Sequence, residues 1–328
     1  MRSLLTATFL LTAAPALAGV NDVIRDHALP GTARFASATA ALDAAAQANC
    51  TDTALRPAYQ EAFDAWLGIA HLTLGPLEED GRGLAIAFWP DTRGMVGRSV
   101  ARLVAEEDPI ATSGEYAEVS IAARGLFALE RLLYDEDFAG YGAESYSCAL
   151  AQAMAADLAV LGREVDTAWR EDFAATLGSA GEAGNSRFLS PREASQALYT
   201  ALATGLEFVD DQRLGRPMGS FDAPKPQVAE ARRSGRSLRN VVLSLEALQG
   251  LAGTLSDAPT PKADAAFDRA LTAARGLEDP VFAGVADPAS RIRVEALQND
   301  VRAISEAVGA EVAPALGVSV GFNSADGD

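Results

Sequence analysis

The side chains best suited to chemistry in this sequence are two carboxylates and an imidazole on one face of an expected helix. Glu61, Asp64, Gly68 and His71 follow one another at intervals of three, four and three residues, which places them on the same side of a helix. Carboxylates and an imidazole that face the interior of a helical bundle can hold a hard or borderline metal ion, and Gly68 would permit a second helix to approach closely. The same spacing also describes the solvated face of an amphipathic helix, so the sequence leaves both interpretations open.

Histidine is otherwise scarce, which limits the catalytic chemistry. The chain contains two histidines, His27 and His71, and neither has a second histidine or a cysteine beside it in the sequence. Zinc peptidases commonly use closely spaced histidines such as H-E-x-x-H, and serine hydrolases need a histidine base and often a G-x-S-x-G elbow. The sequence contains no H-E-x-x-H pattern, and both histidines stand alone. A hydrolytic site built from two isolated histidines therefore has no support at this level.

A second candidate site lies between Gly125 and Tyr134, where Phe127, Glu130 and Tyr134 share one helical face. The first six residues, Gly-Leu-Phe-Ala-Leu-Glu, resemble the Gly-x-His-x-x-Glu motif of the imelysin family, the M75 peptidase-like proteins of bacterial envelopes. In that motif the His and the Glu can reach one metal ion. Phe127 occupies the position of the His, and a phenyl ring has no lone pair for a metal. The resemblance implies that Glu130 is a metal ligand that has lost its partner. In the alternative interpretation, Phe127 is a core residue and Glu130 a carboxylate on the helix surface.

Further segments extend the resemblance over nearly the whole chain. It implies two helical bundles that look like a duplication, with Trp89 and Asp91 near the cleft between the bundles, alongside Glu130 and Tyr134. Asp91 is also placed to cap the helix that follows it. The segments that resemble the family are the Trp-Pro sequence within 87–91, the Gly-Leu and Leu-Gly-x-Pro block within 204–219, the serine pair Ser234 and Ser237, and the Gly-Phe-Asn-Ser ending within 317–328.

The resemblance also carries an expectation of function. The family takes its name from a reported insulin-cleaving peptidase, and relatives occur in periplasmic iron-acquisition systems. Because the motif His is absent, we expect a non-enzymatic exported protein that binds a metal or a metal chelate in the inter-bundle cleft. Iron or another divalent metal is the expected bound species, and an envelope iron-transport component the expected partner. Two alternatives stay open: an M75-type metallopeptidase that uses Glu130, and an envelope protein whose cleft binds a peptide or a partner.

Helices account for nearly every long segment, because apolar residues recur at helical spacing and no segment shows sustained strand alternation. Ser190-Pro191-Arg192-Glu193 predicts a capped helix start, and Asp287-Pro288 predicts another. Pro314 predicts that the last helix ends near residue 312. Long helices joined by short loops predict antiparallel bundles. The expected helices are 20–46, 55–74, 95–105, 117–134, 147–177, 193–212, 227–255, 263–275 and 290–312.

The stretch 177–186 is rich in Gly and Ser and is the best candidate linker. We therefore expect a signal peptide over 1–18, an N-terminal bundle over 19–178 and a C-terminal bundle over 190–328. The Gly-Leu sequences that begin at residues 125 and 205 are compatible with a duplication, although they are too short to show one.

The first residues predict export. Arg2, an apolar run over 4–11 and an Ala-Leu-Ala sequence that ends at Ala18 form the pattern of a secretory signal peptide. The apolar run is shorter than the roughly 20 residues that a membrane-spanning helix needs. We expect cleavage after Ala18 and a periplasmic protein without stable membrane insertion. The formal net charge of −18 argues against nucleic acid and anionic lipid surfaces as partners. This charge either attracts cations or serves solubility.

Cys50 and Cys148 are the two cysteines of the chain. In an oxidising compartment such a pair most simply forms one disulfide. Two buried free thiols and a metal pair are the alternatives, and the lack of CxxC spacing argues against the metal pair.

Overall fold

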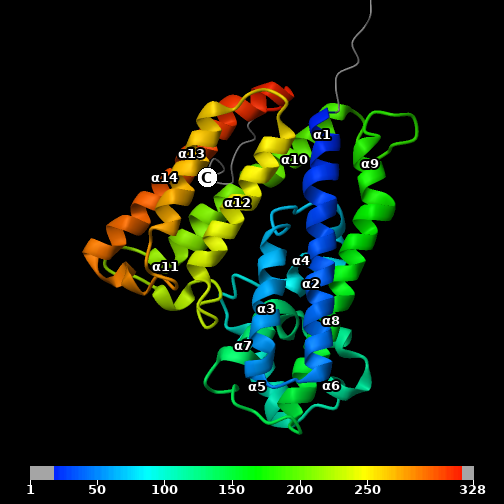
Figure 1. Cartoon of the computed structure of the whole chain (residues 1–328), viewed down its shortest axis with the longest axis vertical. Helices are drawn as coiled ribbons and strands as arrows, with labels where there is room; N and C mark the ends of the chain where they lie inside the picture. The colour runs from blue at the N-terminus through cyan, green and yellow to red at the C-terminus, as the bar shows by residue number, and fades with distance from the viewer. Residues whose placement is uncertain (1–17, 320–328) are drawn as a thin grey trace, which may run out of the picture.

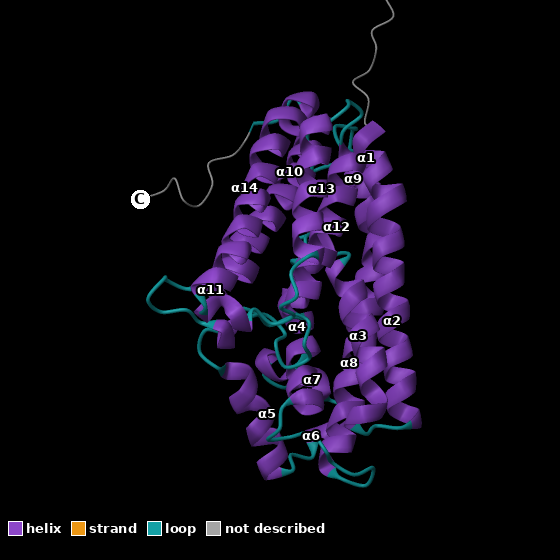
Figure 2. Ribbon diagram, turned by 60° about the vertical axis from the view of Figure 1, so that its left-hand side comes forward, coloured by secondary structure: helices purple, strands orange, loops and turns teal. Residues whose placement is uncertain are grey.

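The computed structural model describes residues 18–319, and its regular elements in this range are all helices (Figures 1 and 2). The all-α fold predicted from the sequence is confirmed. The expected signal peptide up to residue 17 and the C-terminal segment from residue 320 onward lie outside the described residues. Within residues 18–319, no helix is long and apolar enough to cross a membrane.

The helices up to residue 178 pack around a shared core. The first three elements run end to end from residue 18 to 48, and α2 lies along α3 and α8 (Figure 1). Phe35 on α2 meets Trp66 on α3 with ring centroids 5.6 Å apart. The elements are α1 (Ala18–Asp22), η1 (Val23–Ala28), α2 (Leu29–Ala48), α3 (Asp52–Leu67), η2 (Gly75–Leu77), η3 (Glu79–Gly81), α4 (Arg82–Ile86), α5 (Met95–Glu106), α6 (Ile110–Ser113), η4 (Tyr116–Glu118), η5 (Ile121–Ala123), α7 (Gly125–Tyr134), α8 (Tyr146–Ala168), η6 (Trp169–Phe173) and α9 (Ala174–Gly178).

The helices from residue 191 onward form a second group (Figure 1). Four long helices pack in a ring, with α10 against α12, α12 against α13, α13 against α14 and α14 against α10. The chain passes between the two groups over 179–190, close to the predicted linker; the division into two domains and the duplication stay predictions. The elements are α10 (Pro191–Glu207), η7 (Phe208–Gly215), α11 (Arg216–Met218), η8 (Pro226–Val228), α12 (Ser237–Leu255), α13 (Pro261–Arg275), η9 (Ala283–Ala286) and α14 (Pro288–Leu316).

Several helix ends differ from the predictions, and the largest or most informative differences are these. α3 ends at Leu67, where the chain turns instead of continuing to residue 74. α7 begins at Gly125 rather than at residue 117, because the φ of +76° at Gly125 interrupts any helix that enters from upstream. α12 begins at Ser237 rather than at residue 227, after a loop that contains another positive-φ glycine. The predicted stop at 312 is wrong: α14 includes Pro314 in its last turn, and Gly317 closes that turn with φ +64°.

The predicted helix caps are present. The hydroxyl of Ser190 accepts a hydrogen bond from the N–H of Glu193, and the Glu193 carboxylate accepts one from the N–H of Leu189 at 2.7 Å. Asp287 caps α14 by accepting from the N–H of Ser290 at 2.8 Å. Asp91 accepts from the first two N–H groups of α5, both at 2.8 Å. These contacts satisfy helix-end donors that would otherwise lack partners.

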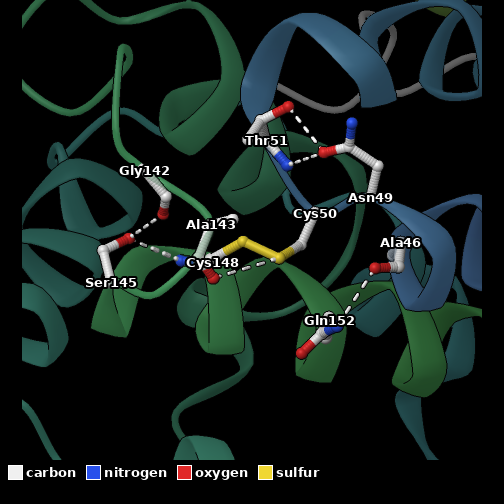
Figure 3. The surroundings of a disulfide bond; sticks show 9 residues. All are labelled: Ala46, Asn49, Cys50, Thr51, Gly142, Ala143, Ser145, Cys148 and Gln152. Atoms are coloured by element: carbon white, nitrogen blue, oxygen red, sulfur yellow. Dashed lines mark hydrogen bonds between the residues drawn. A yellow bond between two sulfur atoms is a disulfide. The ribbon is translucent and has the colours of Figure 1, made fainter.

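Cys50 and Cys148 form a disulfide, as predicted (Figure 3). The bond joins the segment after α2 to the first turn of α8, with Cα atoms 5.1 Å apart. The hydroxyl of Ser145 caps α8 by accepting from the N–H of Cys148, and Gln152 donates to the carbonyl of Ala46 at 3.1 Å. The disulfide and these hydrogen bonds hold α2 and α8 together at one end of the first group.

We expect substitution of both cysteines by serine to lower the free energy of unfolding by about 2–4 kcal/mol, because the bond closes a long loop in the unfolded chain. The separation of 98 residues sets the size of that loop. Urea denaturation of the double variant and the parent measures the difference. Alkylation of the oxidised, folded parent without reductant should modify no thiol, and two modified cysteines would show that the bond does not form.

Candidate functional site

Asp64 lies at the junction of the two helical groups, where two arginines of the second group hold its carboxylate. It is 7% exposed. Oδ1 accepts hydrogen bonds from Nη2 of Arg236 at 2.7 Å and from Nε of Arg239 at 2.8 Å, and Arg239 also donates to Oδ2. Burial opposes ionisation of Asp64, but the hydrogen bonds from Arg239 and Arg236 together outweigh burial and lower its pKa. Asp64 is therefore an ionised group that joins α3 to α12.

Glu61, Asp64 and His71 do not come together as the sequence suggested. Glu61 is exposed and His71 is buried. Because α3 ends at Leu67, the helical spacing that would have aligned His71 with the carboxylates is lost. Within residues 18–319, no group of three or more His, Cys, Asp or Glu side chains is placed to hold a metal ion.

Glu130 also connects the two groups. Its carboxylate, 3% exposed, accepts from the backbone N–H of Ser234 at 2.9 Å and from the Ser234 hydroxyl at 2.7 Å. Burial raises the pKa of Glu130, and the Ser234 hydrogen bonds and nearby arginines offset part of that rise. The first serine of the predicted pair thus contacts the glutamate of the predicted motif.

A buried polar network continues from Asp64 into the second group. Arg236 is 1% exposed and donates from Nε to the side chain of Asn240 at 2.9 Å. Asn240 donates to Glu230 at 2.9 Å, and Glu230 pairs with Arg213 at 2.7 Å. Arg213 reaches the wall of the cavity between the groups. The network therefore runs from the interface of the groups to that cavity.

Phe127 belongs to an aromatic wall. Its ring stands edge-on to Phe63, with centroids 5.5 Å apart, and stacks on Trp89 at 6.3 Å with an interplanar angle of 16°. Trp89 in turn meets Phe208 of the second group at 5.6 Å. Such ring contacts stabilise the packing by more than the burial of their apolar area alone. The position of the motif His is therefore filled by a ring that extends an apolar surface across both groups.

The cavity beside this wall has a volume of about 480 Å³, and we call it the inter-bundle cavity. Both helical groups contribute to it, and its walls are largely apolar, with a few polar groups among them. This is the usual composition of a site for a small organic molecule. The first group provides His71, Trp89 and Phe127, and the second provides Phe208, Ser244 and Leu248.

A neighbouring cavity of about 170 Å³, the arginine-lined cavity, shares Trp89 and Phe127 with the first. Asp91 and Glu130 lie on its wall, but their carboxylates already accept hydrogen bonds from α5 and from Ser234. Of the predicted cleft residues, Gly125 and Tyr134 line neither cavity; Tyr134 packs on Tyr59 and accepts a hydrogen bond from Gln60. The other residues on this wall include Arg131, Arg216, Arg232 and Arg233.

The two histidines lie in contact. Nε2 of His27 on η1 is 2.8 Å from Nε2 of His71, which follows α3. Burial lowers the pKa of His27 to about 4. Burial also lowers the pKa of His71 well below its usual range, and the nearby His27 and Arg213 lower it further. Both rings are therefore neutral at neutral pH, with one Nε2 donating to the other.

Sequence reasoning missed His27, Arg236 and the Arg213–Glu230 pair as parts of this junction. The polar residues Arg236, Asn240 and Glu230 lie near the serine pair Ser234 and Ser237 in the sequence. The serine pair pointed to this segment as part of the resemblance, but it did not indicate which residues the segment would contact. Nothing in the sequence pairs His27 with His71, because contacts between distant segments follow from packing rather than from local spacing.

Comparison with known proteins gives consistent results. The family model described as Imelysin, Peptidase_M75, matches residues 28–308. The fold is similar to an imelysin-like protein from Psychrobacter arcticum 273-4, with a TM-score of 0.77, 19% identity and coverage of 95% of this chain and 100% of that one. It is also similar to a "putative iron-regulated protein A precursor" from Parabacteroides distasonis ATCC 8503, with a TM-score of 0.72, 14% identity and coverage of 91% and 96%. None of the curated proteins compared with the chain matches it.

Proposed function

The chain belongs to the imelysin family, and from this premise we propose that it is an exported, non-enzymatic protein that binds a small organic ligand or a metal chelate in the inter-bundle cavity. The observation that carries the proposal is the cavity itself. Its volume of about 480 Å³ and its aromatic and aliphatic walls suit an organic molecule. Within residues 18–319 no group of three or more His, Cys, Asp or Glu side chains is placed to hold a metal ion, so the proposal rests on the fit of an organic molecule to these walls.

The link to metal uptake rests on the solved relative whose name describes it as iron-regulated. A metal held by an organic chelator fits the cavity better than a free ion. The walls consist largely of the rings and methyl groups of side chains, and they offer few charged ligands. Export to the periplasm is supported by the signal-peptide pattern and by the Cys50–Cys148 disulfide. An envelope transport component would then receive the ligand.

A non-enzymatic role is supported by the burial of Glu130 and by its hydrogen bonds to Ser234. A metallopeptidase needs an open metal position and a base near it. Glu130 is buried and bound to Ser234, and the ring of Phe127 stands where the family motif has a His. These contacts make the motif helix a structural connection between the two groups.

We expect the substitution Thr204→Trp to abolish ligand binding. Thr204 is exposed on α10 and lines the inter-bundle cavity, so an indole at this position would fill space that the ligand needs. Native mass spectrometry of protein isolated from the periplasm should show an added mass on the parent, and metal analysis of the same sample shows whether the ligand carries iron.

Thr272→Trp is the matched control. Thr272 is also exposed and, like Thr204, lies in the last turn of a long helix. Both threonine hydroxyls donate to the carbonyl four residues earlier, at 2.8 Å for Thr204 and 2.7 Å for Thr272. It lies on α13, away from the residues that line the cavity. The control should keep the added mass. Retention of the ligand by Thr204→Trp would place the binding site elsewhere and refute the proposal.

A further inference from the structure

The whole chain contains two histidines, and the fold brings them into contact. His27 comes from the π-helical turn within the first long helix, and His71 from the turn after α3. The ring centroids are 4.9 Å apart and the ring planes are inclined by 53°. The two Nε2 atoms face each other at 2.8 Å.

The pair lies where the two helical groups meet. A Cβ atom added to Gly250 on α12 would lie 3.4 Å from Nδ1 of His27, and one added to Gly205 on α10 would lie 3.1 Å from Cβ of His71. The second group therefore presents two glycines to the two histidines, and its helix backbones approach closely. His71 also lines the inter-bundle cavity, so the pair has an opening on that side.

A hydrogen bond between two neutral imidazoles engages the lone pair of only one of the two Nε2 atoms. One ring must carry its proton on Nε2 and the other on Nδ1. Over residues 18–319 neither ring has another hydrogen-bond partner. A metal ion accepts both Nε2 lone pairs at once, with both rings in the same tautomer. Metal–nitrogen bonds of about 2.0–2.1 Å place two nitrogens about 2.9 Å apart at the right angle of a tetragonal Cu²⁺ or Ni²⁺ site, close to the 2.8 Å in this structure. At the tetrahedral angle that Zn²⁺ prefers, the nitrogens would lie about 3.3 Å apart, so a small shift of one ring would be needed.

We propose that His27 and His71 form a two-histidine site for one late first-row divalent metal ion, Cu²⁺, Ni²⁺ or Zn²⁺. Imidazole nitrogen suits these metals, and among them Cu²⁺ binds most tightly. No third protein ligand completes a cluster within the described residues, so the remaining coordination positions are open to water or to a donor atom in the inter-bundle cavity. The site is distinct from the motif helix of Phe127 and Glu130.

The test uses the mature protein without a histidine tag, freed of metal with a chelator. Calorimetry with Cu²⁺ should show one site, and electron paramagnetic resonance should show couplings to two imidazole nitrogens. His27→Gln and His71→Gln should each weaken Cu²⁺ binding by about tenfold or more, as loss of a ligand costs at least as much as loss of an outer-shell partner. Each variant should also remove one nitrogen from the spectrum.

The double variant His27→Gln/His71→Gln contains no histidine, so it measures binding by every other group in the chain. Unchanged Cu²⁺ affinity in the double variant would overturn the proposal. If the variants fail to fold, the parent labelled with the heavy nitrogen isotope in histidine still gives a result, because its spectrum must change on labelling. An unchanged spectrum would equally overturn the proposal. Neither result depends on the organic ligand, so failure here and failure of the proposed function are distinguishable.

Discussion

Replacing Asp64 by asparagine is expected to lower the free energy of unfolding by about 3–5 kcal/mol, because it leaves a buried arginine without its counter-charge. Arg236 is 1% exposed, donates to Asp64 at 2.7 Å, and lies over the ring of Phe63 at 4.3 Å. An asparagine at position 64 fits the same space but carries no charge. Urea denaturation at neutral pH measures the loss.

Asp300→Asn is the matched control. Asp300 forms an ion pair of similar length, 2.9 Å, with Arg269, but the Arg269 side chain is 54% exposed. Exposed ion pairs contribute at most about 1 kcal/mol. The control should therefore lose far less stability than Asp64→Asn. Equal small losses in both variants would show that the Asp64 carboxylate does not hold the two groups together.

The free energy of unfolding that Asp64 contributes should also depend on pH, and it should decrease in acid. Its pKa in the folded protein is lowered below the unfolded value of about 3.9. Such a group contributes its full stability above the unfolded pKa and loses it as the pH falls through the folded pKa. The difference between the parent and Asp64→Asn should thus be constant at neutral pH and shrink below about pH 4. The pKa of Glu130 is raised instead, but Glu130 is present in both proteins, so the comparison at each pH cancels its effect.

The sequence predicts those parts of the fold that depend on neighbouring residues. The cap formed by Ser190 and Glu193 and the start of α14 at Asp287 are local patterns, and the structure contains them. The disulfide was predicted from a single pair of cysteines in a chain expected to be exported. Helix ends were less predictable, because they depend on backbone angles at single residues, such as the left-handed conformation at Gly125.

The junction of the two groups was beyond prediction for a physical reason. Asp64 and Arg236 are 172 residues apart, and helical spacing assigns a residue to a face without stating what covers that face. A carboxylate on the polar side of α3 is equally consistent with solvent, a metal ion or a buried arginine. His27 and His71 pose the same problem, since their contact requires the turn after Leu67 that helical periodicity did not indicate. The sequence alone identifies Phe127 as a departure from the motif that it resembles, but the stacking of Phe127 on Trp89 depends on a loop from elsewhere in the chain.

Gly125→Ala should be the other strongly destabilising substitution, with an expected loss of about 3–5 kcal/mol. Gly125 has φ +76°, a conformation that costs an L-residue roughly 1–2 kcal/mol. A Cβ atom at this position would also lie 2.2 Å from the carbonyl oxygen of Ala85 and 2.3 Å from that of Ile86. Both obstacles are backbone atoms of α4 and cannot rotate away, so overpacking adds up to about 3 kcal/mol.

Gly114→Ala separates the two contributions. Gly114 has nearly the same conformation, φ +78°, but an added Cβ would meet nothing within 4 Å. This variant should lose only the roughly 1–2 kcal/mol of backbone strain, and the excess loss in Gly125→Ala then measures the close approach of α4 to α7. Because α7 carries Phe127 and Glu130, a shift of its first turn would also move Glu130 away from Ser234. Gly125→Ala should therefore bind less ligand in the inter-bundle cavity even where it is still folded, whereas Gly114→Ala should bind like the parent. Equal losses of stability in the two variants would mean that α4 yields to the added methyl group, and that the first residue of the motif serves only to start the helix.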